Sequence, residues 1–455
     1  MLFHSATFLV SVTVLVALYW LAPWHRVRLQ LLFLSSLVFY GWRHWPSVFL
    51  LLGSIAVNYT LGRLLESRRS KALLAFGVTI NLSFLAYFKY GRFAVDQLIS
   101  LGALVGVELE VPKPDAWMPL GISFFTFQVI AYLVDVYRKE IPAERSLLVF
   151  AVFKSFFAQL VAGPIVRGKE FLPQLHRAVP FELARIHRGA WLVLCGLFLK
   201  VGVADVLGDY VDYAWKFPET LGINNAWLTI YAYAAQLLAD FWGYSTMAVG
   251  LALCFGLTLP VNFENPYGAS SLRDFWTRWH ITLSVWLRDY LYISLGGNRV
   301  SRGRAAFNRL VTMALGGLWH GAGWNYVIWG VLHAAWMELE LVTQTFRARW
   351  PKWLGVVITF HVVVFLWIPF RAPSLAALGT MLSRLVSAPW DINTPTQTAV
   401  MTLGFLVLQK PLFSLVRAER ADTLKPLAEV ALAAAMVWLL LAYGSARQDF
   451  IYYVF

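Results

Sequence analysis

The sequence predicts an all-α, polytopic integral membrane protein. Of its 455 residues, 59% are hydrophobic and 14% are charged, and the mean hydropathy is +0.61. A soluble domain is about 45–50% apolar and about 25% charged, so this chain has too little polar surface to cover a globule in water. The apolar residues form long runs that suit membrane-crossing helices, unlike the short alternating segments of a membrane β-barrel.

Apolar runs follow one another along most of the chain. We expect about eleven crossings, with the shorter runs re-entrant or interfacial. The first run is expected to remain in the mature protein, because nothing basic precedes it and no small-residue cleavage site follows it. The runs are residues 5–22, 29–41, 48–65, 72–87, 118–136, 147–161, 189–203, 227–259, 311–318, 324–341, 354–368, 398–415 and 428–441.

No linker or internal repeat divides the chain, which predicts one transmembrane domain over residues 1–455. Within it we distinguish N-terminal helices over residues 1–110, a catalytic core over about residues 115–345 and C-terminal helices over residues 353–455. The two cysteines, Cys195 and Cys254, lie in apolar runs without CxxC spacing. They are expected to be packing residues and not a disulfide or metal site.

The net charge of +13, from 38 Lys and Arg against 25 Asp and Glu, needs no nucleic-acid partner. Cytoplasmic loops of membrane proteins carry excess Lys and Arg. The acidic or neutral connections at residues 108–115, 205–219 and 389–396 are then expected on the outer side of the membrane, together with the N-terminus. This alternation is consistent if the 147–161 run enters the membrane and returns to the same side. The predicted cytoplasmic loops contain Arg63, Arg68, Arg69 and Lys71; Arg138, Lys139 and Arg145; Arg167, Lys169, Arg177, Arg185 and Arg188; and Arg299, Arg302, Arg304 and Arg309.

The composition of residues 260–325 is typical neither of a membrane span nor of a solvated loop, because Trp and Tyr are interleaved with Arg and Asp. Such segments suit helices that lie at the membrane interface or inside a water-containing funnel. On a single helix Trp276, Trp279 and Leu283 would share one face. A purely interfacial anchor is the alternative that this pattern leaves open.

His320 is the strongest candidate for chemistry. It lies in the glycine-rich segment 316–324, which predicts an irregular break between two apolar runs. Irregular backbone at membrane depth is tolerated where it lines a cavity, and an ionisable residue there is a functional hypothesis. We predict that His320 is a general base, against the alternative of a hydrogen-bonded packing histidine. His280, at the end of an aromatic and basic cluster, could face the same cavity, whereas packing or loop roles are predicted for the other histidines, including His333.

Cofactor motifs are absent from the sequence. It has no HExxH, P-loop or dinucleotide fingerprint, and Glu338 and Glu340 lie too far along the next helix to be assigned as metal ligands beside His320. No metal and no bound cofactor are therefore predicted. The natural docking place for a phosphorylated donor is the fourth basic loop, which contributes Arg299, Arg302, Arg304 and Arg309.

At these residues the sequence resembles the membrane-bound O-acyltransferase (MBOAT) family, in particular a bacterial branch that contains the alginate O-acetyltransferase membrane subunit. The resemblance covers about two thirds of the chain, in the family's order, and its runs are specific when taken together. They are residues 119–128, 135–138, 159–167, 244–245, 275–280, 286–292, 295–299 and 317–321.

The resemblance implies helices around a central funnel or tunnel, with His320 catalytic and His280 beside it. It also implies a bacterial inner-membrane enzyme that takes acetyl from acetyl-CoA or another thioester and delivers it across the membrane for O-acetylation of alginate-like exopolysaccharide, cellulose or peptidoglycan. An extracytoplasmic acetyltransferase partner would complete the transfer. A transporter or channel without acyl chemistry is the alternative. The residues expected along the channel are Trp279, Trp319, Arg278, Arg288, Asp289, Asn298, Asp240 and Tyr244.

One departure from the family pattern falls in residues 240–246. This chain has Trp242 where the branch usually has serine, and Thr246 where it usually has an acid. If the segment lines the channel, Trp242 would narrow it.

Overall fold

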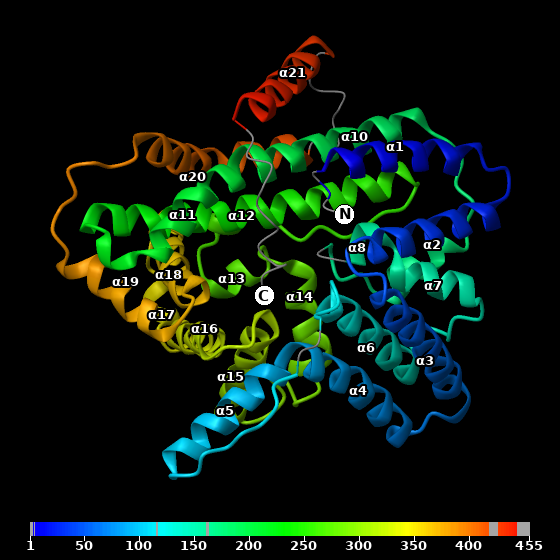
Figure 1. Cartoon of the computed structure of the whole chain (residues 1–455), viewed down its shortest axis with the longest axis horizontal. Coiled ribbons are helices and arrows are strands. Elements are labelled where there is room, and N and C mark those ends of the chain that lie inside the picture. Colours follow the sequence, from blue (N-terminus) through cyan, green and yellow to red (C-terminus); the bar gives the residue numbers. More distant parts are fainter. Residues whose placement is uncertain (1–2, 4, 115–116, 161–162, 418–425, 444–455) are drawn as a thin grey trace.

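The computed structural model describes residues 3, 5–114, 117–160, 163–417 and 426–443. Over these residues the chain is helical and contains no strand (Figure 1). The all-α prediction is confirmed. Asp115 and Val161, which end the predicted outer segment 108–115 and the re-entrant run 147–161, lie outside the described residues.

The helices follow one another with short connections. They are α1 Ala6–Leu21, α2 His25–Gly41, α3 Ser47–Arg68, α4 Lys71–Leu85, α5 Gly91–Leu104, α6 Ile122–Arg138, α7 Leu147–Ser155, α8 Phe157–Leu160, α9 Gly168–Leu175, α10 Leu183–Leu197, α11 Val206–Lys216, α12 Ile223–Cys254, α13 Leu272–Trp276, α14 Ile281–Trp286, α15 Arg302–His320, α16 Trp324–Val342, α17 Gln344–Arg347, α18 Lys352–Arg371, α19 Leu375–Ser387, α20 Thr396–Arg417 and α21 Pro426–Tyr443. Three π-helical segments join some of them within this part of the chain: η1 Ala86–Tyr90, η2 Phe198–Asp205 and η5 Leu287–Tyr292. Short 3₁₀ turns occur at η3 Pro218–Thr220 and η4 Pro266–Gly268.

Six helical segments of the described chain are long and apolar enough to cross a membrane, which shows a multi-pass membrane protein. The expected number of about eleven crossings is not reached by this measure. Ala6–Leu21 and Leu375–Ser387 are apolar but shorter than a span. The six segments are Ser47–Arg68, Lys71–Leu104, Leu183–Lys216, Ile223–Cys254, Lys352–Arg371 and Thr396–Val416.

The central helix of the fold is α12, whose apolar window is 89% buried although it is long enough to cross a membrane. It packs closely on α10 because glycines face each other at two levels. A Cβ atom built on Gly196 would lie 2.5 Å from the carbonyl oxygen of Gly243, and one built on Gly189 would lie 2.7 Å from that of Gly250. Only glycine allows the two backbones to come this close.

We therefore expect Gly196→Val to destabilise the protein by about 1–3 kcal/mol, because the added side chain must push α10 away from α12. The thermal unfolding midpoint in detergent measures this loss. Gly404→Val on α20 is the matched control, since a Cβ atom there meets nothing within 4 Å. Equal midpoints for the two variants would contradict the close packing.

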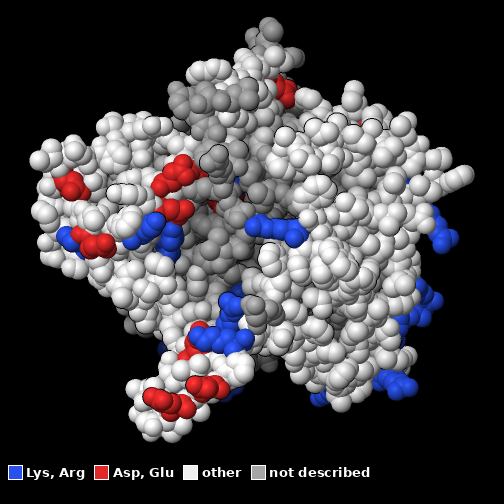
Figure 2. All heavy atoms as spheres, in the orientation of Figure 1, with Lys and Arg blue, Asp and Glu red and all other residues white. Residues whose placement is uncertain are grey.

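Some of the predicted loops lie close together in the structure. The segment 389–396, predicted outside, binds the start of α12, because Asp391 accepts hydrogen bonds from the Gly222 amide at 2.6 Å and from Asn225 at 2.7 Å. The segment 205–219, also predicted outside, lies largely within the candidate span Leu183–Lys216. Two predicted cytoplasmic loops meet at Asp289 of η5, where Arg138 donates to the Asp289 carbonyl and Arg167 pairs with the Asp289 carboxylate. Figure 2 shows Lys and Arg along the edge that holds the α3–α4 turn, and Asp and Glu at the far tip of the α5 arm.

Two segments differ from their predicted local structure. The 147–161 run is split at Phe156 into α7 and α8, each too short to cross a bilayer, which suits a segment that enters and returns. The single helix predicted to align Trp276, Trp279 and Leu283 is wrong. The chain breaks between α13 and α14, where the Ile281 amide donates to the Asn262 carbonyl and His280 takes a left-handed φ of 42°.

Candidate active site

His320 is the last residue of α15, where the helix gives way to Gly321 in an extended conformation. The predicted break over residues 316–324 is therefore shorter than expected, because Gly316 and Gly317 lie inside the helix. These residues stay helical because α15 and α16 pack backbone to backbone: a Cβ atom on Gly317 would lie 2.1 Å from the carbonyl oxygen of Tyr326. The close helix pair fixes the position of His320.

The C-terminal carbonyls of α15 are held by a second element, the π-helical segment η1. The Lys89 ammonium group donates to the carbonyl of Trp319 at 2.6 Å and to that of His320 at 3.1 Å. The Tyr90 hydroxyl donates to the Leu318 carbonyl at 2.7 Å. A cation at a helix C-terminus is favoured by the helix dipole. Lys89 thus fixes the backbone that carries His320.

Sequence reasoning missed Lys89, although a signal was present. The residue lies within Lys71–Leu104, a segment long and apolar enough to span a membrane. A lysine in such a segment is a functional hypothesis by default.

An aromatic cage surrounds the His320 side chain, which is 3% exposed. The ring centroids of Trp319, Trp329 and Phe370 lie 5.0, 5.3 and 5.2 Å from that of His320, all edge to face. Three segments of the chain contribute these rings, α15, α16 and α18. The cage excludes water, so electrostatic interactions of the imidazole are stronger than in solution.

His280 is the second histidine of this chamber, its ring centroid 6.4 Å from that of His320. It is fully buried and lies edge to face against Phe241 at 4.6 Å. Asn262, in the loop before α13, holds the backbone next to His280, because it accepts hydrogen bonds from the Thr282 hydroxyl and the Ile281 amide. The structure therefore brings the two predicted catalytic histidines together from distant parts of the sequence.

A third histidine, His333, lies behind the cage and had been assigned a packing role. It is fully buried, with its ring 4.6 Å from Trp329, and it accepts a hydrogen bond at Nδ1 from the Trp276 indole at 3.3 Å. Its Nε2 must then carry the proton. This N–H and the indole N–H groups of Trp319 and Trp329 have no hydrogen-bond partner among the residues that the structure describes. Buried donors without a partner are uncommon, so these three N–H groups are available to donate hydrogen bonds to a bound substrate.

The sequence comparison decides which family this architecture belongs to. The model of the MBOAT, membrane-bound O-acyltransferase family matches residues 29–382. The chain belongs to this family.

Three enzymes of named activity are similar to this chain over 55–90% of its length. The probable alginate O-acetylase AlgI of Pseudomonas aeruginosa is 40% identical over 431 residues, covering 90% of this chain and 81% of the relative. The peptidoglycan O-acetyltransferase of Helicobacter pylori is 36% identical over 389 residues, covering 78% and 73%. The teichoic acid D-alanyltransferase of Streptococcus thermophilus is 27% identical over 288 residues, covering 55% and 68%. This membrane-bound O-acyltransferase is therefore an acyl-transferring enzyme, and the alternative of a transporter without acyl chemistry is set aside.

The other residues predicted to line the channel of this acyltransferase are spread over several parts of the fold. Trp319 belongs to the cage, while Trp279 lies in the next aromatic layer with its ring 4.9 Å from Trp367. Arg278 is paired with Asp274 at 2.7 Å. Two residues lie on the central helix α12: Asp240 pairs with Lys200 at 2.9 Å, and Tyr244 stacks on Phe3 at 4.5 Å.

The remaining predicted residues lie in η5 and in the turn that follows it. Arg288 and Arg167 both bind Asp289, at 2.6 and 2.7 Å. Burial alone raises the pKa of this carboxyl, but hydrogen bonds from the two arginines outweigh it and hold the pKa below its usual range. Asn298 accepts a hydrogen bond from the Tyr292 hydroxyl at 2.5 Å. This group lies apart from the histidine chamber in the contacts that the structure describes.

The four arginines predicted to dock the donor do not behave alike in this acyltransferase. Arg309 is bound by Glu338 and donates to the Tyr292 hydroxyl at 3.2 Å. Arg299, which precedes α15, and Arg302 and Arg304, in the first turn of this helix, are exposed. Among the described residues, no three His, Cys, Asp or Glu side chains gather closely enough to hold a metal ion.

Proposed function

We propose that this enzyme takes an acetyl group from a cytoplasmic thioester, with acetyl-CoA as the default donor, and delivers it across the bacterial inner membrane for O-acetylation of a cell-envelope polysaccharide. The observation that carries the proposal is the chamber itself. His320 lies at the end of a helix, enclosed by aromatic rings and held by Lys89 on a segment of membrane-crossing length. About eleven crossings and a tunnel through the bilayer belong to this proposal.

In this mechanism His320 acts as the general base. It accepts the proton of the acceptor hydroxyl while the hydroxyl oxygen attacks the thioester carbonyl, the C–S bond breaks, and the proton passes to the leaving thiolate. General base catalysis contributes about 10²–10⁴ in rate. The free N–H groups of Trp329 and Trp319 supply donors for the carbonyl oxygen as negative charge develops on it. His280 supports the chamber wall beside His320.

The acceptor class follows from the relatives. Alginate and peptidoglycan are named for the proteins that are 40% and 36% identical to this chain, so an alginate-like exopolysaccharide, cellulose or peptidoglycan is the acceptor that we propose. The polymer lies outside the membrane, and a separate extracytoplasmic acetyltransferase partner is proposed to complete the modification.

Full-length protein in liposomes, given acetyl-CoA with a radiolabelled acetyl group, tests the donor. Label should leave CoA in the presence of the wild type, and transfer to polysaccharide should require the extracytoplasmic partner. A protein that is folded but consumes no acetyl-CoA, with or without the partner, would exclude this donor.

The exposed arginines at the start of α15 are proposed to attract the donor phosphates. Charge reversal by Arg302→Glu with Arg304→Glu should raise the KM for acetyl-CoA about tenfold, with kcat nearly unchanged, because the two sites lose attraction for a polyanion. Initial rates at low and high salt measure the effect, which salt should reduce. The double variant Arg68→Glu and Arg69→Glu, in another basic loop, is the control. An unchanged KM would remove Arg302 and Arg304 from the donor site.

A further inference from the structure

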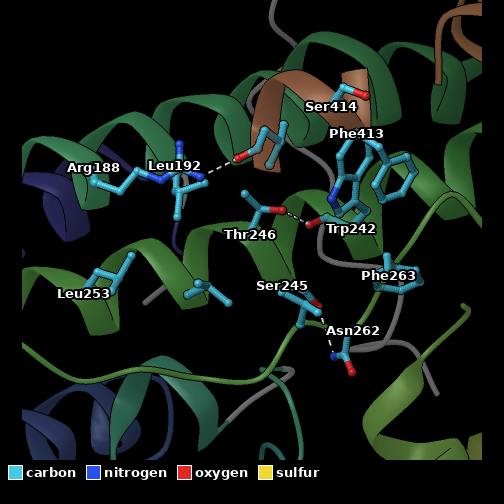
Figure 3. A pocket seen from close by; sticks show the side chains of 13 residues that line it. Arg188, Leu192, Trp242, Ser245, Thr246, Leu253, Asn262, Phe263, Phe413 and Ser414 are labelled. Atoms are coloured by element: carbon cyan, nitrogen blue, oxygen red, sulfur yellow. Dashed lines mark hydrogen bonds between the residues drawn. The ribbon is translucent and has the colours of Figure 1, made fainter. Parts of the chain in front are cut away.

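A cavity of about 830 Å³ lies between α10, α12 and α20 (Figure 3). Its volume is within the range of about 300–1,000 Å³ that small-molecule sites occupy. The inner wall comes from α12 through Trp242 and Thr246, while α10 contributes Leu192 and α20 contributes Phe413. All three helices belong to segments long and apolar enough to cross a membrane. The cavity therefore lies mainly among helices of membrane-crossing length, and the chain after α12 adds Val261, Asn262 and Phe263 to its lining.

The two ends of this cavity differ in chemistry. Arg188 lines one end, where its guanidinium also donates to the Val416 carbonyl at 2.8 Å. At the opposite end Trp242 stacks on Phe413 with ring centroids 3.8 Å apart (Figure 3). Along α12 the lining extends from Leu253 to Trp242, which corresponds to about 16 Å of helix. The cavity is thus an elongated slot with a cation at one end and aromatic rings at the other.

The polar side chains along the slot are bound by the protein. The Thr246 hydroxyl donates to the Trp242 carbonyl at 2.8 Å, which satisfies its donor within the helix. Asn262 donates to the Ser245 hydroxyl at 3.2 Å and accepts from the Thr282 hydroxyl at 2.7 Å. A molecule in the slot therefore meets mainly apolar surface beyond Arg188, which favours a hydrocarbon chain over a polar solute.

The position of Arg188 identifies the leaflet. It is the last arginine of the third basic loop, which the positive-inside rule predicts to be cytoplasmic, and it lies in the second turn of α10. Arginine at this level attracts the anionic headgroups of the inner leaflet. The slot then extends from headgroup level into the membrane, which matches the shape and the polarity of one lipid molecule.

We propose that this cavity binds one anionic phospholipid of the cytoplasmic leaflet, with its phosphate at Arg188 and one acyl chain along α12 as far as Trp242 and Phe413. The lipid would support the wall of the histidine chamber. Phe263, which lines the slot, lies 5.0 Å from Phe241, and Phe241 lies 4.6 Å from His280. The site is separate from the donor route proposed above and does not depend on the identity of the donor.

Lipid that co-purifies with the full-length protein tests the proposal. Wild-type protein, washed extensively in mild detergent, should retain about one phosphatidylglycerol per chain by quantitative mass spectrometry of the extracted lipid. Added phosphatidylglycerol should also raise the thermal midpoint of delipidated protein more than phosphatidylethanolamine does. Arg188→Gln should weaken retention about fivefold through the lost charge. Leu192→Trp and Thr246→Phe should fill the slot from two different helices and abolish retention.

Arg185→Gln is the matched control, because Arg185 pairs with Glu182 at 2.8 Å and does not line the cavity. It should retain lipid like the wild type. Absence of retained phospholipid in the wild type, or equal retention in Arg188→Gln and in both filling variants, would overturn the proposal. Displacement of the lipid by acetyl-CoA would also overturn it and would assign the cavity to the donor, which leaves the acetyl-transfer function standing.

Discussion

His320→Ala should abolish acetyl transfer while leaving the protein folded. The His320 imidazole is the group proposed to accept the proton of the acceptor hydroxyl, and its removal should lower kcat by at least about 10²–10⁴. The free energy of unfolding should change less than the activity, because the backbone of residue 320 stays bound to Lys89 through its carbonyl. Label release from acetyl-CoA measures kcat, and the thermal midpoint in detergent measures folding.

His361→Ala provides the matched control, since this histidine lies on α18, is exposed and interacts with the carbonyl of Val357 in its own helix. It should keep wild-type activity. Substantial acetyl transfer by folded His320→Ala protein would remove His320 from the chemistry and would leave the imidazole as a packing residue of the cage.

Lys89→Met should give the second largest loss. Methionine keeps the length of the side chain but removes the donors that hold the carbonyls of Trp319 and His320. A buried acceptor without a partner costs about 1–3 kcal/mol, so the end of α15 should relax. Misplacement of a reacting group by about 1 Å can lower the rate about 10²-fold. We expect a loss of this size in kcat, with little change in the KM for acetyl-CoA.

The conservative variant Lys89→Arg should recover part of the rate, because a guanidinium can still donate to the same carbonyls. Lys113→Met removes the same charge at an exposed site, where Lys113 pairs with Asp96 at 2.6 Å, and should leave kcat unchanged. A Lys89→Met protein whose kcat equals that of the wild type would show that the ammonium group does not position His320.

Much of the fold was predictable because membrane insertion leaves a strong trace in sequence. The length of each apolar run predicted α3, α12 and α18 to within a few residues. The expected number of about eleven crossings stays a prediction, because the length of an apolar run does not separate lipid-facing helices from buried ones. For example, α6 consists largely of apolar residues but is mostly enclosed by other helices and is shorter than the six candidate spans.

The site was predicted in part for a similar reason. His320 and His280 were recognisable because an ionisable residue among glycines and tryptophans is unusual in an apolar chain. The contacts of Lys89 and His333 depend on tertiary structure, since Lys89 meets a carbonyl 231 residues further along the chain. Glycine at 316 and 317 predicted a break, but close packing against α16 keeps these residues helical, because glycine serves helix contact as well as chain flexibility.

The π-helical segments also affect which insertions and deletions the gene can tolerate. Each of the three contains charged side chains: Lys89 in η1, Lys200 and Asp205 in η2, and Arg288 and Asp289 in η5. Deletion of one codon there would turn the following helix by about 100° relative to the preceding one. For η1 such a turn would move Lys89 away from the carbonyls that it binds. Reading-frame-preserving changes should therefore accumulate in exposed connections and be rare within these three short segments.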